Sequence, residues 1–219
     1  MSVLALVRAD QNMSGTAGSD SPALIQVADI PLVVHTVRRL FDSGLVDQVL
    51  VTVSATERAA VSTVLVDHGL NPDDPASHVR LVVGAVDHTM ALASVPDAEV
   101  LLVHDVLHAF AGPDLVRRVV AEVRATGGPV VPVLPCTDTV KQLDPTGLVL
   151  STPDRSELRV AQTPEGFPAA ALRAAGPGGL DQLRGRARTV AGDPDARRLV
   201  SAFDLTVAET LLTGTRGDA

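Results

Sequence analysis

The chain has 219 residues, of which 46% are hydrophobic and only 2% aromatic, and its formal net charge is −8. This length suits one α/β domain with a full hydrophobic core. The negative charge argues against non-specific binding to phosphate polymers. Because the chain has no Trp or Tyr, few rings are available to stack on bases, so no nucleic-acid partner is expected.

A single cysteine, Cys136, excludes an intrachain disulfide and a multi-cysteine zinc site, and it indicates a reducing compartment. No apolar run reaches the roughly 18 residues of a membrane span. The N-terminus also lacks a basic segment followed by a long apolar stretch. We therefore expect a cytoplasmic protein with no membrane partner.

Strand-like and helix-like patterns alternate over the first part of the chain. A continuous apolar run at 3–7 predicts a first buried strand, and the apolar residues from Pro31 to Ser43 recur at helical spacing. The alternation continues, with strands expected at 46–53, 79–83, 100–103 and 130–133, and helices at 56–68, 89–95 and 115–126. This order predicts an α/β fold with a mainly parallel sheet and helices on both faces.

The segment 8–23, between the first strand and the first helix, is rich in Gly, Ser, Asp and Asn and has no periodicity. It predicts a long loop, and a loop in this place lies over the sheet edge where ligands bind. Gly15 and Gly18 would let its backbone approach a phosphate, but their spacing matches no phosphate-binding motif cleanly. A nucleotide-binding loop and an ordinary flexible loop both remain open, and the flexible loop is favoured.

The strand at 100–103 is an unbroken apolar run that ends at His104 and Asp105. Because ligands of open α/β sheets gather beyond the carboxyl ends of the strands, Asp105 is expected at the functional edge. Its carboxylate would suit a divalent cation among phosphate oxygens. Alternatively, Asp105 caps the helix that begins near Pro113. His104 and His108 could flank a metal, but no third ligand is evident, so hydrogen-bonded structural histidines are favoured.

The pattern breaks between Pro135 and Arg159. Short polar-alternating pieces at 137–141, 148–152 and 157–160 are separated by turn sequences and predict an antiparallel hairpin arm. An uncovered two-stranded ribbon is marginal alone, so the arm at 135–159 is expected to pack on a second copy and form a homodimer.

After the arm, a helix at 169–175, a strand at 188–190 and a helix at 202–212 complete one domain over residues 1–219. The most basic local region lies in this part of the chain. It is interpreted mainly as a solvated face, with Arg198 the one candidate at the ligand edge, and it comprises Arg184, Arg186, Arg188, Arg197 and Arg198.

Several short motifs in a fixed order carry a resemblance to a known family. They are Val103-His104-Asp105, Asp138-Thr139-Val140-Lys141, Asp154-Arg155, the Gln-Thr-Pro-Glu-Gly-Phe-Pro segment at 162–168, and Gly192 with Arg198 and Asp204-Leu205. In this order and spacing the chain resembles 2-C-methyl-D-erythritol 4-phosphate cytidylyltransferase over nearly its whole length. The resemblance implies a Rossmann-like nucleotidyltransferase sheet, similar to that of glycosyltransferase A, with a protruding β-hairpin arm.

The resemblance implies a reaction that joins CTP to a phosphorylated polyol in the non-mevalonate isoprenoid pathway and releases pyrophosphate, with magnesium. Because this is phosphoryl transfer, catalysis depends mainly on positioning and charge neutralisation. By resemblance, Asp105 holds the metal and the nucleotide, and Arg198 takes the place of a family lysine. These two are the candidate catalytic residues. Thr139, Arg155 and Thr163 correspond to residues that contact the phosphorylated polyol, and a guanidinium such as that of Arg155 can bind a phosphate bidentately.

The departures from the family fall in the segments that bind the nucleotide. The family's first loop reads Ala-Ala-Gly-x-Gly-x-Arg and then Pro-Lys-Gln. Here the glycine positions hold Asn12 and Ser14, the arginine position falls near Gly15, and the lysine position holds Ala23. The Gly-Gly-x-x-Arg-x-x-Ser segment that reads the cytidine keeps only Gly84 of its glycine pair.

These departures bear on activity. His108 also stands where the family has an arginine. Losing one preorganised charge of this kind typically costs roughly 2.7–4 kcal/mol of barrier. We therefore expect weak or lost cytidylyl transfer. The alternative is a non-catalytic relative that acts as a ligand-binding or regulatory subunit, and the fold alone does not choose between the two.

Overall fold

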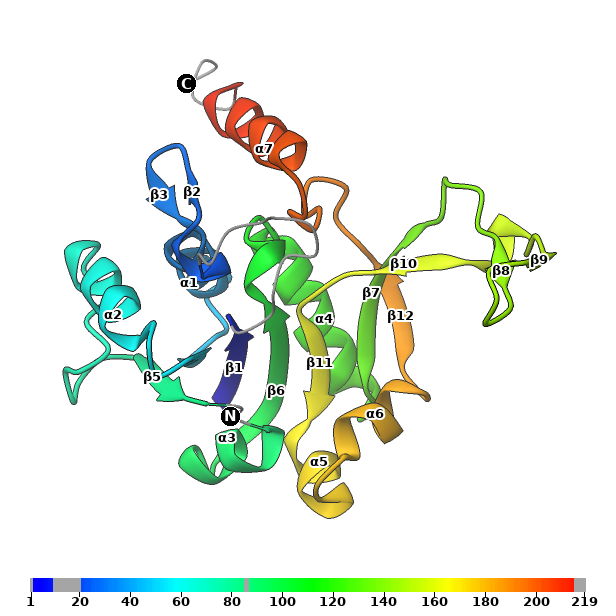
Figure 1. Ribbon diagram of the computed structural model, residues 1–219. Helices are drawn as coiled ribbons and strands as arrows, with labels where there is room; N and C mark the ends of the chain where they lie inside the picture. Colours follow the sequence, from blue (N-terminus) through cyan, green and yellow to red (C-terminus); the bar gives the residue numbers. More distant parts are fainter. Residues whose placement is uncertain (1, 10–20, 85–86, 215–219) are drawn as a thin grey trace.

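A mainly parallel, eight-stranded sheet forms the centre of the computed structural model, which describes residues 2–9, 21–84 and 87–214 (Figure 1). The strands are β1 (Ser2–Arg8), β4 (Gln48–Val53), β5 (Val79–Val83), β6 (Ala98–Asp105), β7 (Val130–Pro135), β10 (Arg159–Ala161), β11 (Glu165–Pro168) and β12 (Arg188–Ala191). Their order is β10-β7-β11-β6-β1-β4-β5, with β12 also paired to β7. The predicted α/β fold class is confirmed.

Helices cover both faces of this sheet. They are α1 (Leu32–Asp42), α2 (Arg58–Asp67), α3 (His88–Ser94), α4 (Pro113–Thr126), α5 (Ala169–Ala175), α6 (Gly179–Arg184) and α7 (Ala202–Gly214). Along β1, Val3, Ala5 and Val7 belong to a buried cluster with α1, α2 and α4, whereas Leu4 and Leu6 pack with α3 and α5. A strand covered on both faces needs apolar residues at every position, which is why the strand sequences read as continuous apolar runs.

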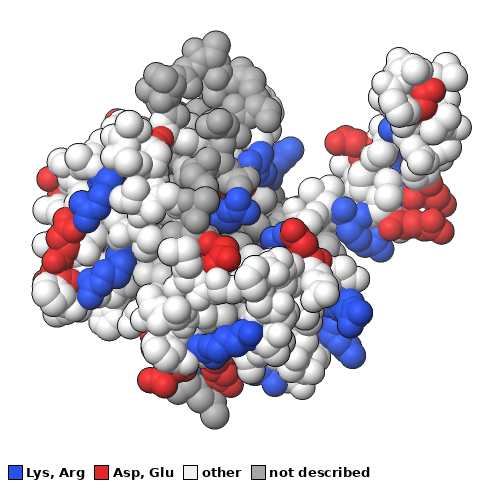
Figure 2. All heavy atoms as spheres, turned by 60° about the horizontal axis from the view of Figure 1, so that its bottom comes forward, with Lys and Arg blue, Asp and Glu red and all other residues white. Residues whose placement is uncertain are grey.

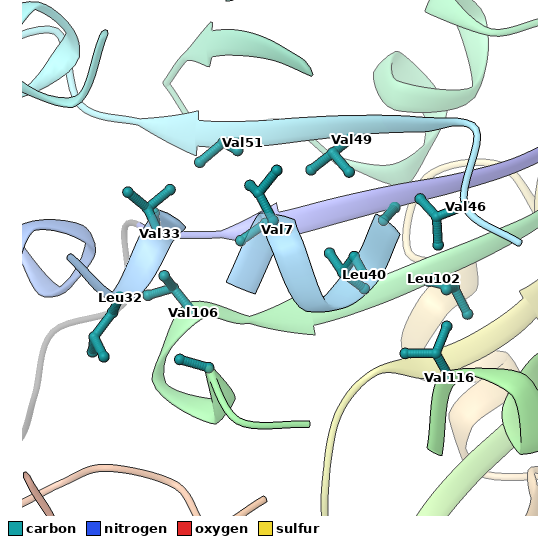
Figure 3. Close-up of a cluster of buried hydrophobic side chains, with 14 of the residues drawn as sticks. Val7, Leu32, Val33, Leu40, Val46, Val49, Val51, Leu102, Val106 and Val116 are labelled. Carbon is teal, nitrogen blue, oxygen red and sulfur yellow. The ribbon is translucent and has the colours of Figure 1, made fainter. Parts of the chain in front are cut away.

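Helix α1 lies across the first of these clusters. Its buried residues recur at helical spacing and are Leu32, Val33, Val34, Thr36, Val37 and Leu40. Figure 3 shows Val33 and Leu40 close to Val7 of β1 and to Val49 and Val51 of β4. Just past the end of the helix, Gly44 adopts φ +69°, a left-handed conformation that glycine reaches without steric cost. The predicted helix at 31–43 is confirmed with nearly the same bounds.

The chain reverses its direction across the sheet between β1 and β6. From β1 it proceeds to β4 and β5 on one side, and then returns to β6 on the other side of β1. Ligands of open α/β sheets bind at such a switch point, beyond the carboxyl ends of the strands. The last residues of the two strands, Arg8 and Asp105, are paired in register here. The predicted ligand edge at Asp105 therefore coincides with the switch point.

Two elements in the central sheet and its helical layers were missed by the sequence patterns. Strand β11 lies antiparallel between β6 and β7, and α6 lies between α5 and β12. At Gly166 of β11, a Cβ atom would overlap the side chains of Val119 and Val123, so the glycine allows α4 to approach the strand closely. The strand predicted at 157–160 was assigned to the arm, and that assignment is wrong. The strand found there, β10, pairs with Leu134 and its neighbours in the central sheet.

An arm does leave the body between β7 and β10, and it carries β8 (Gln142–Leu143), β9 (Val149–Ser151) and the turn η3 (Arg155–Glu157). Strands β8 and β9 form a separate antiparallel pair, but the predicted strand at 137–141 is wrong, since these residues have no strand structure. Figure 1 shows the arm standing clear of the body, and Figure 2 shows acidic and basic side chains on it among uncharged surface. Leu148 and Leu150 of the arm are 65% and 59% exposed.

Between β1 and α1, the described residues form the turn η1 (Pro22–Leu24) and a hairpin of β2 (Gln26–Val27) and β3 (Ile30–Pro31). Its two-residue turn, Ala28-Asp29, has positive φ at both positions, as the favoured hairpin turn requires. Among the described residues, no helix is both long enough and apolar enough to span a bilayer.

Candidate functional site

Asp105 ends β6, and both oxygens of its carboxylate are engaged. Oδ1 accepts the backbone N–H of Leu107 at 3.0 Å and so caps the short turn η2 (Val106–His108). Oδ2 accepts Nε–H of Arg198 at 2.8 Å. The alternative prediction, that Asp105 is a helix cap, is therefore correct about capping and wrong about the element. Asp105 caps η2 and not α4, which begins at Pro113 after Gly112.

Arg198 lies in the loop between β12 and α7, at the same edge of the sheet. The next residue, Leu199, donates its backbone N–H to the carbonyl of Leu107 at 2.9 Å, which ties this loop to η2. Arg198 uses only Nε toward Asp105. Within the described part of the chain, its terminal guanidinium nitrogens have no hydrogen bond, and the side chain is 36% exposed. This leaves a planar pair of donors available to an anion.

Thr163 joins the same group through its hydroxyl. Oγ1 accepts the backbone N–H of Asp105 at 3.1 Å, and it lies 2.9 Å from Nδ1 of His104 and 3.2 Å from Nδ1 of His108. A hydroxyl has one hydrogen to donate and two lone pairs to accept with. One imidazole nitrogen therefore accepts from the hydroxyl while the other donates to it. With three partners, the Thr163 hydroxyl is fully used within the protein.

The two histidines are buried and carry lowered pKa values. The pKa of His104 is lowered to about 3, mainly by burial and then by the nearby His108, while Asp105 opposes the effect. Burial also lowers the pKa of His108 to about 4, with Asp105 opposing and Arg198 reinforcing the shift. Both imidazoles are neutral at pH 7. Their contacts with Thr163 make these histidines part of a hydrogen-bond network. Throughout the described ranges, no group of three or more His, Cys, Asp or Glu residues could hold a metal ion.

A cleft opens on the α3 and α6 side of this edge. Arg8 from β1, Thr52 from β4 and Val103 from β6 line it, together with Asp87 and His88 at the start of α3. Asp87 caps α3, since its Oδ1 accepts the backbone N–H groups of residues 89 and 90. The cleft therefore has polar and charged walls at the carboxyl ends of three neighbouring strands, where a ligand of this fold is expected.

The other predicted site residues do not join the Asp105 group. Gly84 follows β5 and adopts φ +95°, and it donates its N–H to the carbonyl of Val53. Thr139 and Arg155 are exposed on the arm, where Arg155 donates to the carbonyl of Thr137 at 3.3 Å. The predicted nucleotide-binding positions in the first loop lie outside the described residues; they are Asn12, Ser14 and Gly15.

Two features of this region were not predicted. Arg184, interpreted as part of a solvated face, instead binds the buried Glu165 through Nε and a terminal nitrogen, at 2.6 to 3.0 Å, so that prediction is wrong for this residue. Gln162 was quoted only as part of the motif at 162–168, and no role was predicted for it. Its buried carboxamide makes hydrogen bonds to Asp193 and Ala196, in the loop that carries Arg198. The signal for it in the sequence was its place in that motif, beside Thr163.

The family model described as 2-C-methyl-D-erythritol 4-phosphate cytidylyltransferase matches residues 12–214. A protein of that name from Nocardia farcinica is 40% identical over 225 residues, covering 96% of this chain and 94% of its own. This chain belongs to the 2-C-methyl-D-erythritol 4-phosphate cytidylyltransferase family. A second member, from Saccharopolyspora erythraea, is 41% identical over 230 residues and covers 97% of this chain and 100% of its own.

Solved structures of the family share the fold. A 4-diphosphocytidyl-2C-methyl-D-erythritol synthase superposes with a TM-score of 0.74 at 21% identity, over 96% of this chain and 99% of the other. The cytidylyltransferase from Thermus thermophilus superposes with a TM-score of 0.69 at 24% identity, over 97% and 100% of the two chains. At these identities the likeness shows the fold alone, and it agrees with the mainly parallel sheet described above.

Proposed function

We propose that this chain binds CTP and 2-C-methyl-D-erythritol 4-phosphate, the substrate in the name of its relatives, and transfers the cytidylyl group with release of pyrophosphate. The observation that carries the proposal is the meeting of Asp105, Arg198 and Thr163 at the switch point between β1 and β6. Three segments far apart in the sequence meet there, at the place where this fold binds ligands.

In this proposal the charged residues bind and orient the substrate phosphates and a magnesium ion. Arg198 offers a guanidinium to a substrate phosphate, which is the recognition a planar donor pair favours. Asp105 would hold a magnesium ion, which needs only one or two protein carboxylates when substrate phosphates and water complete its shell. Such an ion would supply charge neutralisation at the phosphates. The single carboxylate of Asp105 fits that role, because an ionised carboxylate has about four acceptor sites and only two are used, one by the N–H of Leu107 and one by Nε–H of Arg198.

We propose further that the protein acts as a homodimer in the cytoplasm, with the arm packed on the partner subunit. Exposed apolar side chains on the arm support this, because a ribbon with so much exposed apolar surface gains by being covered. They are Val140, Leu143, Leu148, Val149 and Leu150. Thr139 and Arg155 would then reach a phosphorylated polyol from the arm, and the lone cysteine suits a reducing compartment.

We propose that turnover is slow, and the surroundings of Ala23 support this. Ala23, at the position of the family's loop lysine, is 0% exposed within the core cluster, so its side chain faces protein and not a phosphate. This observation and the two engaged oxygens of Asp105 also favour a second candidate function. In that alternative the chain binds the phosphorylated polyol as a regulatory or partner subunit without turnover.

Pyrophosphate release and thermal stability, measured together with magnesium present and absent, test both functions. Pyrophosphate release that requires both CTP and the phosphorylated polyol supports the transferase. A rise in melting temperature with either ligand, at background pyrophosphate release, supports the binding subunit. A protein that shows neither response contradicts both. Turnover near one per second, within the ordinary enzyme range, would contradict the slow turnover proposed here.

A further inference from the structure

Gln162 and Thr163 are consecutive residues between β10 and β11; Thr163 contacts Asp105, and Gln162 contacts the loop that carries its ion-pair partner Arg198. Thr163 holds the side of Asp105, because its hydroxyl accepts the backbone N–H of that residue at 3.1 Å. Gln162 holds the other side, because its carboxamide binds the loop at 192–199 from which Arg198 projects. Two neighbouring side chains thus organise partners that lie far apart in the sequence.

The carboxamide of Gln162 is buried and fully hydrogen-bonded. Nε2 donates to the carbonyls of Asp193 and Ala196, both at 2.8 Å, and Oε1 accepts the backbone N–H of Asp193 at 2.8 Å. Two carbonyl partners require the NH2 group on that side, so the partners fix the orientation of the amide. The side chain is 2% exposed, and therefore water does not replace a bond that is lost.

The loop at 192–199 is anchored on both sides of these contacts. Gly192 donates its N–H to the carbonyl of Val133 at 2.9 Å, and Leu199 donates to Leu107 at 2.9 Å. A Cβ atom at Gly192 would overlap Oε1 of Gln162, so the glycine is what allows the carboxamide to lie this close. Arg198 is next to one anchor and two residues from Ala196, which Gln162 also holds.

We propose that Gln162 is a positioning residue for Arg198. It fixes the 192–199 loop so that the guanidinium lies against Asp105 and presents its terminal nitrogens to a phosphate. The identity of that phosphate as substrate rests on the proposed function, but the positioning itself does not. Gln162 is 2% exposed and the three hydrogen bonds of its carboxamide all go to the loop, so it acts through the loop and not by touching the ligand.

The test follows the Nε–H resonance of Arg198 by nuclear magnetic resonance in the full-length protein, assigned by its loss in Arg198→Lys. In the unaltered chain this hydrogen bonds Asp105 and should exchange slowly with solvent. Gln162→Glu is nearly isosteric and keeps one acceptor for Asp193, but it loses both donations to carbonyls. The matched control is Gln48→Glu, the same change at an exposed position at the start of β4, on the opposite edge of the sheet.

Gln162→Glu should lose the slow exchange of the Arg198 Nε–H and weaken the binding of inorganic phosphate by about tenfold, equivalent to about 1.4 kcal/mol. Gln48→Glu should change neither. If Gln162→Glu does not fold, Gly192→Ala crowds the same carboxamide from the loop side and should give the same two changes. An unchanged Arg198 resonance with unchanged phosphate affinity in a folded variant would overturn the proposal.

A double variant separates positioning from a general loss of structure. Combined with Arg198→Met, Gln162→Glu should weaken phosphate binding no further than Arg198→Met does alone, because the residue through which Gln162 acts is already gone. A further tenfold loss in that background would contradict the proposal. None of these readouts requires turnover, so a chain that proves inactive with CTP would overturn the proposed transferase and leave this inference standing.

Discussion

Arg198 donates its Nε–H to Oδ2 of Asp105 at 2.8 Å although the two residues are 93 positions apart in the sequence. The same carboxylate caps η2 through Oδ1. One side chain thus serves two purposes: it ends β6 in a defined turn, and it holds a guanidinium at the ligand edge. Because the second purpose depends on charge and the first does not, substitutions can separate them.

Asp105→Asn should remove the charge and keep the cap, since Asn is as good an N-cap residue as Asp. We expect the free energy of unfolding to fall by about 1 kcal/mol, the size of a partly exposed charged hydrogen bond. Asp105→Ala loses the cap as well and should cost about 1 kcal/mol more. Urea denaturation measures both values. Equal losses in the two variants would show that the cap contributes nothing.

Thr163→Val should be more harmful than Thr163→Ser. Valine has no hydroxyl, so the N–H of Asp105 and the Nδ1 atoms of His104 and His108 all lose their partner in a buried setting. We expect a loss of about 2–3 kcal/mol, the typical cost of leaving buried polar groups unsatisfied. Serine keeps the hydroxyl and should cost less than about 1 kcal/mol. Denaturation curves that match for the two variants would contradict the network.

Folding stability should fall as the pH drops below about 6.5. The pKa values of His104 and His108 are lowered to about 3 and about 4 in the fold, mainly by burial. Between those values and about 6.5 the unfolded chain binds protons that the folded chain does not. The stabilisation is therefore complete above about pH 6.5 and is lost toward pH 3, by up to about 1.4 kcal/mol per pH unit for each histidine.

Urea denaturation at pH 7 and pH 5.5 checks this, in a range that lies above the ordinary carboxylate pKa values. His108→Gln should reduce the difference in stability between the two pH values, because one of the titrating groups has been removed. The same stability at both pH values in the unaltered protein would show that the histidines take up protons without unfolding.

Elements with a clear period were predictable from the sequence, and contacts between distant segments were not. The runs at 79–83 and 169–175 have the predicted bounds in the structure, because apolar spacing and flanking turn residues are local signals. Strand β11 was missed because Gly166 and Pro168 make its sequence look like a loop. Its partner strands, β6 and β7, supply the pairing that a local pattern does not show.

The site was predictable only in part, for a related reason. Asp105 stood out because it ends an apolar strand, whereas Gln162 has no such signal, and its role depends on a loop about 31 residues further along the chain. The partners of Thr163 lie 55 to 59 residues before it, so the resemblance pointed to this residue without revealing that its hydroxyl is fully used. The side-chain type fixes how many hydrogen bonds a residue can make, but the fold decides which partners use them, and residue spacing in the sequence does not show those partners.

The arm should hold two copies of the chain together. Leu150→Asp places a charge on exposed apolar surface of β9 and should convert a dimer of about twice 22.7 kDa into a monomer. Val66→Asp, at an exposed apolar position on α2, is the control and should stay dimeric. Light scattering at micromolar concentration measures both. A compact monomer in the unaltered protein would rule out the proposed dimer.

Restoring a lysine at position 23 should not restore turnover. Ala23 lies in η1 with 0% of its surface exposed, so a lysine there must either bury its ammonium group or displace the turn. An uncompensated buried charge typically costs about 3 kcal/mol or more, and Ala23→Lys should lower the free energy of unfolding by that amount. Gln26→Lys, at an exposed position three residues on, should change the free energy of unfolding by no more than about 0.5 kcal/mol.

Pyrophosphate release from CTP and the phosphorylated polyol should stay near background in both variants. A stable Ala23→Lys protein that releases pyrophosphate faster than the unaltered chain would show that this position does face the nucleotide and that the missing lysine limits the reaction.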